Sequence, residues 1–166
     1  MTNLIYDVKI VNTFFVFFTF TSYVKLQDAY VSENNGPGNW VTIGFIAPGA
    51  SSASDVAGNT PAFAYTGGGA APTITCPDGY TADGDKCKMT ENGKDTFASA
   101  LSGDLEAGFV ATSNAKLNDC MSGTAWRIDT KVASGTTTYT KTIGGEAPSA
   151  NATCNALTPQ FANIGK

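Results

Sequence analysis

Histidine is absent from this 166-residue chain, and charged residues make up only 14% of it. Without histidine, the usual serine–histidine and cysteine–histidine nucleophile arrangements cannot be built. Ten basic residues against fourteen acidic ones give a net charge of −4, which leaves no cationic face to neutralise a phosphate backbone. We therefore expect a protein that is not an enzyme, uses no cofactor and has no nucleic-acid partner.

The shortage of charge is filled by small and neutral polar residues, chiefly Thr, Ser, Asn, Gly and Ala. Average soluble proteins carry about 25% charged residues. Neutral polar surfaces of this kind are common on exported proteins that meet their neighbours in fibres, coats or filaments. With 42% hydrophobic residues, the chain is long enough for one compact domain with an apolar core.

Four cysteines fall into two spacings. Cys76 and Cys87 bracket a short turn-rich stretch, while Cys120 and Cys154 bracket a longer Thr/Gly-rich region. Pairing 76 with 87 and 120 with 154 is the simplest of three connectivities. A zinc site would need all four thiols without any Cys-x-x-Cys spacing, so disulfides are favoured. Closing each loop would remove on the order of 3 kcal/mol of denatured-state entropy. This pattern favours an extracytoplasmic domain.

Residues 10–20 form the strongest apolar run and hold five of the ten phenylalanines. The run is too short to span a bilayer as a helix, which takes about 20 residues. Its β-branched and aromatic content is compatible with a strand or with a membrane-proximal helix. We treat residues 1–20 as an atypical N-terminal segment and residues 21–166 as the main domain.

An amphipathic helix is predicted directly after this segment. Its apolar face consists of residues at helical spacing, namely Tyr23, Leu26, Tyr30 and Val31. Polar residues lie between them, namely Lys25, Gln27, Asp28, Ser32 and Glu33. The helix is expected to end at residues 34–38, where Asn, Gly and Pro cannot continue it. Its apolar face must lie on another element, which we expect to be a sheet.

Beyond residue 38 the pattern changes to that of β-strands. Residues 40–46 and 62–65 are predicted strands, and residues 72–76 and 86–89 are predicted to form a disulfide-pinned hairpin that turns at Asp83-Gly84. Asn92-Gly93 marks another tight turn.

Three further strands are expected in the C-terminal half. Residues 105–112 are one candidate, and residues 124–132 show the clearest alternation, with Trp126 and Ile128 on one face. Gly135 turns the chain into residues 136–143. The sequence therefore predicts an α+β fold with an N-terminal amphipathic helix packed on a mostly antiparallel sheet.

Two parts of the chain resemble bacterial type IV pilin-like proteins. Tyr-Val-Lys-Leu-Gln-Asp-Ala-Tyr-Val-Ser-Glu-Asn at residues 23–34, followed by Gly-Asn-Trp-Val-Thr-Ile-Gly-Phe at residues 38–45, is similar to the second half of the long pilin helix and its first loop. Leu-Asn-Asp-Cys at residues 117–120, Trp-Arg-Ile at 126–128 and Cys-Asn-Ala-Leu-Thr-Pro-Gln-Phe at 154–161 resemble a pilin C-terminal region. The resemblance runs from about residue 22 to residue 166.

The resemblance implies a structural subunit of a type IV pilus or a type II secretion pseudopilus. Such a subunit is made as a precursor held in the inner membrane and then joins other pilin subunits in a surface filament, with a role in adhesion. In that family a C-terminal disulfide, here Cys120 with Cys154, encloses a variable surface region, here residues 121–153. Cys76 and Cys87 would form a second, additional disulfide in the main domain.

The N-terminus departs from the family pattern. Pilins begin with a short basic leader, a glycine, then Phe-Thr-Leu-hydrophobic-Glu and a long apolar helix. Residues 1–20 contain neither Gly nor Glu. One hypothesis is that this segment is a misassigned or frameshifted start, joined to a pilin head at about Thr21.

The remaining candidate residues can be interpreted either as core residues or as residues of a binding site. The helix and sheet are expected to meet through Tyr23, Leu26, Tyr30 and Val31 on one side and Trp126 and Ile128 on the other. Surface aromatic residues would instead suit a secreted polysaccharide-binding module, the alternative function; the candidates are Trp40, Tyr65, Tyr80, Trp126 and Tyr139. Asp78, Asp83 and Asp85 lie among turn glycines as weak calcium candidates, but the EF-hand pattern is incomplete, so no metal is expected.

Overall fold

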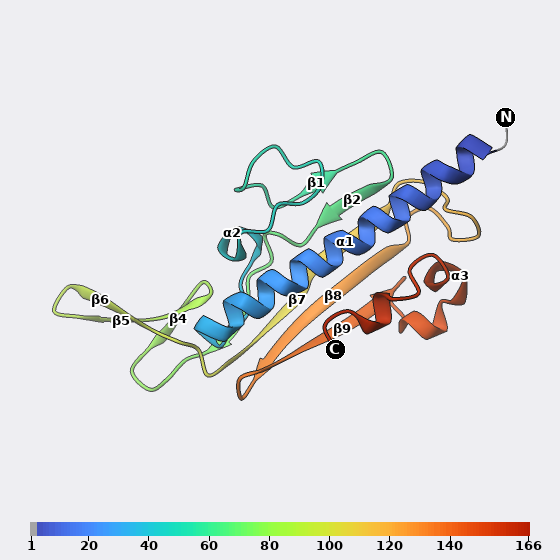
Figure 1. The fold of residues 1–166 in the computed structure, drawn as a ribbon. Helices are drawn as coiled ribbons and strands as arrows, with labels where there is room; N and C mark the ends of the chain where they lie inside the picture. The colour runs from blue at the N-terminus through green and yellow to red at the C-terminus, as the bar shows by residue number, and fades with distance from the viewer. Residues whose placement is uncertain (1–2) are drawn as a thin grey trace.

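A computed structural model describes the backbone of residues 3–166 and the side chains of residues 16–166. It confirms an α+β architecture in which one long N-terminal helix lies along a mostly antiparallel sheet (Figure 1). The helices are α1 (Asn3–Asn34), α2 (Trp40–Ile43) and α3 (Ala152–Asn155), with the 3₁₀ helices η1 (Pro148–Ala150) and η2 (Phe161–Asn163). The strands are β1 (Gly58–Asn59), β2 (Phe63–Thr66), β3 (Thr73–Thr75), β4 (Thr81–Asp83), β5 (Lys86–Glu91), β6 (Lys94–Ala98), β7 (Ser102–Ser113), β8 (Ala125–Ala133) and β9 (Thr136–Ile143).

Helix α1 has 32 residues and is about 48 Å long at 1.5 Å per residue. It includes residues 10–20, so the apolar run is helical and does not form a strand. It also passes residues 20–21, the proposed start of the main domain, without a break. The helix ends as predicted: Asn35 adopts a φ of 54°, its N–H donates to Val31 O at 2.8 Å, and Pro37 follows.

The predicted strand at residues 40–46 is wrong, because residues 40–43 form helix α2. The Asn39 side chain caps this helix by accepting a hydrogen bond from Thr42 N at 3.0 Å. Gly44 ends it with a φ of 72°. These caps outweigh the strand preference of the Trp-Val-Thr-Ile run, and they turn Trp40 into the core.

The main sheet has six strands in the order β1-β2-β7-β8-β9, with β3 also paired to β7. Strand β7 is central: its first residues pair with β3 and its last residues with β2. The strand predictions at residues 62–65, 105–112, 124–132 and 136–143 are confirmed by β2, β7, β8 and β9. On β8 the predicted alternation holds, with Trp126 and Ile128 fully buried.

Strands β4, β5 and β6 form a separate three-stranded sheet, which we call the arm (residues 81–98). It leaves the rest of the molecule, the body, beside the C-terminal end of α1 (Figure 1). The turns at Asp83-Gly84 and Asn92-Gly93 are confirmed. The predicted pairing of residues 72–76 with 86–89 is wrong, because β5 pairs with β4 and β6 while β3 pairs with β7. Strand β3 pairs with the first residues of the longer strand β7, and this pairing takes the place of the predicted hairpin.

The core lies between α1 and the main sheet and is rich in aromatic rings. Its largest buried side chains include Phe20, Tyr23, Trp40, Tyr65, Phe109, Trp126 and Phe161. Ring contacts link α1 to both the sheet and the C-terminal segment, because Phe20 lies 5.1 Å from Phe109 and 4.7 Å from Phe161 between ring centroids. Aromatic pairs at these distances add to the stability that burial provides.

Candidate functional site

The contact between α1 and the sheet is organised by a buried polar network. Gln27 is fully buried, although the helical pattern assigned it to the polar residues of the amphipathic helix. Its Nε2 donates to Gly38 O at 2.5 Å and to Tyr23 Oη at 3.1 Å, and its Oε1 accepts from Gly38 N at 3.2 Å. Tyr23 Oη in turn lies 3.4 Å from Thr130 Oγ1 on β8. Gln27 therefore fixes the loop after α1 while Tyr23 joins the helix to the sheet.

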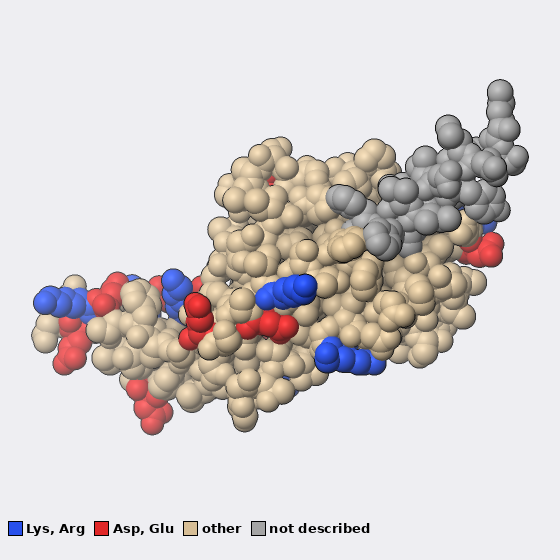
Figure 2. Space-filling model, in the orientation of Figure 1, with Lys and Arg blue, Asp and Glu red and all other residues tan. Residues whose placement is uncertain are grey.

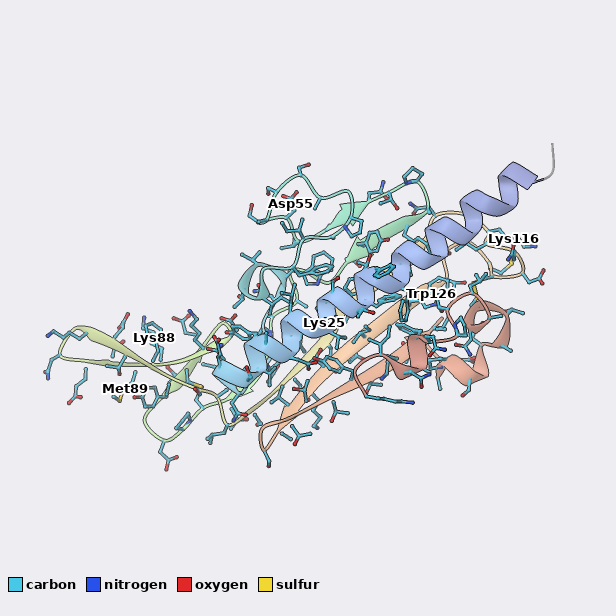
Figure 3. All side chains as sticks on the ribbon, in the orientation of Figure 1. Lys25, Asp55, Lys88, Met89, Lys116 and Trp126 are labelled. Carbon is cyan, nitrogen blue, oxygen red and sulfur yellow. A yellow bond between two sulfur atoms is a disulfide. The ribbon has the colours of Figure 1, made fainter. Side chains whose placement is uncertain are left out.

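The six predicted helix–sheet residues lie at this interface or close to it. Tyr23 and Val31 on α1 are buried, as are Trp126 and Ile128 on β8. Leu26 and Tyr30 are half-buried and pack against the edge of the core. Trp126 lies beneath α1 (Figure 3), and its indole N–H donates to Thr158 Oγ1 at 2.8 Å.

A bulge in β7 provides the socket for Trp40. The pairing register between β7 and β8 shifts between Leu105 and Phe109. Within the bulge, Ala107 has a φ of 47° and its N–H donates to Asp129 Oδ1 at 2.6 Å. The carbonyl of Gly108 accepts the Trp40 indole N–H at 2.7 Å. A side chain at position 108 would collide with Tyr23 Oη, so glycine lets the helix approach the bulge.

A second tie connects α1 to the edge strand β9. Tyr139 Oη donates to Asp28 Oδ1 at 2.6 Å and also lies 3.3 Å from Val24 O. Burial, and after it the neighbouring Asp28 carboxylate, raises the pKa of Tyr139 above its usual value. The phenol therefore stays protonated and acts as a hydrogen-bond donor over the whole physiological pH range.

Both disulfides follow the simplest pairing, Cys76 with Cys87 and Cys120 with Cys154. No free cysteine occurs in the part of the chain whose side chains are described. Disulfides persist in oxidising environments, so the two bonds indicate an extracytoplasmic protein. The pilin resemblance implied a variable surface region between Cys120 and Cys154. This region contains β8 and β9, which carry much of the core.

The calcium candidates do not come together. Asp83 Oδ2 lies 3.9 Å from Lys88 Nζ, and Asp85 faces Tyr30 of α1 closely enough to raise the pKa of that phenol further, beyond the effect of its burial. Within the described residues, no three His, Cys, Asp or Glu side chains are grouped closely enough to hold a metal ion. Asp78 lies in the turn before β4.

Four of the five aromatic residues considered for sugar stacking are buried in the core. Trp40 and Trp126 have no exposed surface, Tyr65 is 1% exposed and Tyr139 is 6% exposed. Tyr80 is half-buried beside the Cys76–Cys87 disulfide. These five rings therefore form no exposed platform on the sheet.

A groove runs beside the outward side of α1. It has a volume of about 370 Å³ and separates the helix from the C-terminal segment. Thr21 and Lys25 line its helix side, and Ile164 lines the other. Phe18, one turn before Ser22, is 54% exposed on the same helix. The groove and the exposed helix face together form a candidate contact surface on the body.

The opposite face of the sheet is polar and balanced in charge. Arg127 Nε pairs with Asp129 Oδ1 at 2.7 Å, and Lys131 Nζ lies 3.8 Å from Asp104 Oδ1. Threonines alternate outward along β9, at positions 138 and 140 among others. Exposed pairs of this kind contribute little to stability, and this face resembles an ordinary solvated sheet surface.

No protein-family model, curated protein or solved structure matches this chain. In the described part of the chain, no helix has both the length and the apolar character required to cross a membrane.

Proposed function

We propose that the protein is a structural subunit of a type IV pilus or of a type II secretion pseudopilus, located at the cell surface and acting without catalysis. The observation that carries this proposal is the arrangement of α1. Its C-terminal half is clamped onto an antiparallel sheet, while its N-terminal turns extend past the end of the sheet (Figure 1). The resemblance of residues 23–45 and 117–161 to pilins and the two disulfides support the same conclusion.

The contacts between α1 and the sheet hold the helix rigidly on the body. Gln27 and Tyr23 tie α1 to the loop and sheet through buried hydrogen bonds, and Tyr139 ties it to the edge strand. A helix held in this way transmits force to the body without sliding, as a filament subunit requires. Neighbouring subunits would contact the exposed helix face and the groove beside it, which includes Lys25. Before assembly the precursor would be held at the inner membrane.

Immunogold electron microscopy of the producing cells tests this proposal. Antibodies raised against the purified chain should label surface filaments in rows along their length. Shearing the cells should move the antigen into the filament fraction. Gold confined to cell bodies, or antigen found only as a soluble monomer in the medium, would show that the protein is not a filament subunit.

Cysteine labelling locates the contact surface in the same cells. In a Lys25→Cys variant, the new thiol should react with a maleimide in purified monomer and be protected in sheared filaments. Thr138→Cys is the matched control, because position 138 is exposed on β9 and faces away from α1. Equal protection of the two thiols in filaments would exclude α1 as the specific contact.

A further inference from the structure

A cleft lies where the arm meets the C-terminal end of α1. It has a volume of about 290 Å³ and is lined by Asn34, Asp85, Lys86, Phe97, Ala98 and Ser99. The end of α1 therefore meets two neighbouring parts of the arm there, the start of β5 and the end of β6. This volume lies at the lower end of the range for small-molecule pockets, about 300 Å³, so the cleft has room for no more than one small ring.

The polar groups around the cleft are mixed and sum to no net charge. Asp85 supplies a carboxylate and Lys86 an ammonium group. Asn34 Nδ2 donates one of its two N–H groups to Tyr30 O at 3.1 Å, which leaves the other N–H and the amide oxygen for a ligand. An anionic ligand would meet the Asp85 carboxylate, and a cationic ligand would meet the Lys86 ammonium. The cleft therefore suits a neutral ligand whose groups both donate and accept hydrogen bonds, as hydroxyl groups do.

Asp85 meets Tyr30 of α1 at the inner end of the cleft. Asp85 Oδ2 and Tyr30 Oη are both buried. Burial, and after it the neighbouring Asp85 carboxylate, raises the pKa of this phenol. The contact holds the Asp85 side chain in the wall of the cleft, where it can accept a hydrogen bond from a hydroxyl group of a ligand.

An aromatic ring forms the outer wall of the cleft. Phe97 is 60% exposed, although large aromatic side chains are normally buried. The Lys86 ammonium lies 6.0 Å from the centre of this ring, at the limit of a cation–π contact, so it can move to a ligand. Figure 2 shows how the arm stands away from the body, which leaves this region open to a large partner.

We propose that this cleft binds a single neutral sugar ring, such as the terminal residue of a glycan, stacked on Phe97 and hydrogen-bonded by Asp85, Lys86 and Asn34. The apolar face of the ring covers Phe97, and its hydroxyl groups meet the mixed donors and acceptors. This inference goes beyond a structural role and holds whether or not the protein assembles into filaments.

An NMR titration of the full ¹⁵N-labelled chain tests the proposal. The probes are the methyl glycosides of β-glucose, β-galactose and α-mannose, with glycine as a zwitterion and inorganic phosphate as an anion. At least one glycoside should shift the amide signals of residues 85–86 and 97–99 at millimolar concentration. Glycine and phosphate should leave these signals in place.

Two variants distinguish binding in the cleft from nonspecific binding to exposed apolar side chains. Phe97→Ala should weaken glycoside binding by about tenfold or more. Leu101→Ala removes a side chain of similar exposure, 53%, that does not line the cleft, and it should bind like the unmodified protein. The proposal is overturned by a cleft that responds to no glycoside, by shifts located elsewhere, by a response to glycine or phosphate instead, or by equal binding in the two variants. Immunogold labelling is independent of this result, so failure of one proposal is distinguishable from failure of the other.

Discussion

The body and the arm of this protein are held together by different means. The body buries a continuous cluster of aromatic and aliphatic side chains between α1 and six strands. The arm adds only a small cluster at its base, in which Ile74, Cys87 and Ala100 are buried. Hydrophobic burial can hold the body, whereas the arm depends on its disulfide and on the short strand pairing around it.

Charged residues, in contrast to buried apolar ones, are concentrated in the arm. Residues 78–95 contain eight charged residues, against ten basic and fourteen acidic ones in the whole chain. Figure 2 shows this concentration on the arm, while most of the body surface in that view is uncharged. Lys88 pairs with Asp95 at 2.8 Å, which raises the pKa of the Lys88 ammonium and lowers the pKa of the Asp95 carboxyl group. Charges on exposed strands keep the arm from pairing with other edges.

The largest effect is expected from truncating the centre of the body. Trp126→Ala should lower the free energy of unfolding by about 3–5 kcal/mol, because it opens a cavity under α1 and leaves the Thr158 hydroxyl without its donor. Urea denaturation followed by circular dichroism measures this. Met121→Ala is the control, since Met121 is 67% exposed, and it should change the value by less than about 0.5 kcal/mol. Equal losses in the two variants would contradict the assigned core.

Loss of the body disulfide should come next. Cys120→Ala combined with Cys154→Ala should destabilise the whole body by about 2–5 kcal/mol, because the bond joins residues 34 apart and encloses two core strands. Calorimetry should show a single unfolding transition at a lower temperature. An unchanged Tm would mean that β8 and β9 hold the C-terminal segment without the bond.

Gln27 tests the buried polar network. Gln27→Ala should cost about 1–3 kcal/mol, because Gly38 N–H and Gly38 O lose their partner while they remain buried. Asp28→Ala, one residue further along α1, changes an exposed side chain that bonds Tyr139 and should cost less. If urea denaturation ranks the two variants the other way, the network is not the main clamp.

A smaller, pH-dependent effect is expected at Tyr139. Its pKa is raised in the folded state, as are those of Tyr23 and of Tyr65, for which burial gives a value of about 12. The unfolded chain therefore loses these phenol protons first, and stability should be fully present below about pH 10 and fall above it. Tyr139→Phe should cost about 1 kcal/mol at neutral pH and reduce the alkaline fall. Identical pH curves for variant and parent, measured by urea denaturation, would contradict the assignment.

The sequence predicted those elements whose signals are local and regular. Alternation along residues 124–132 identified β8, and the Asn-Gly and Asp-Gly pairs identified both turns of the arm. It also predicted the disulfide bonds and the end of α1. The strand, the turns and the helix end depend on neighbouring residues, so tertiary contacts had little room to overrule them, whereas the disulfide pairing was inferred from the number and spacing of the cysteines.

Features that depend on distant partners were missed. The Trp-Val-Thr-Ile run is typical of a strand, but as a helix it brings the Trp40 indole to Gly108 O on β7, a partner 68 residues away. Gln27 looked like a surface residue, since its partner Gly38 is reached only after the chain turns back. Residue 97 alternates within a polar strand, and nothing local to the sequence indicates that the end of α1 lies beside it in a cleft.

Hydrogen exchange on a Cys76→Ala, Cys87→Ala variant tests most directly whether the arm depends on its disulfide while the body does not. The account predicts that amides of residues 81–98 lose their protection, whereas those of α1, β7 and β8 exchange as in the parent protein. Protection retained throughout the arm, or lost equally from the body, would contradict it.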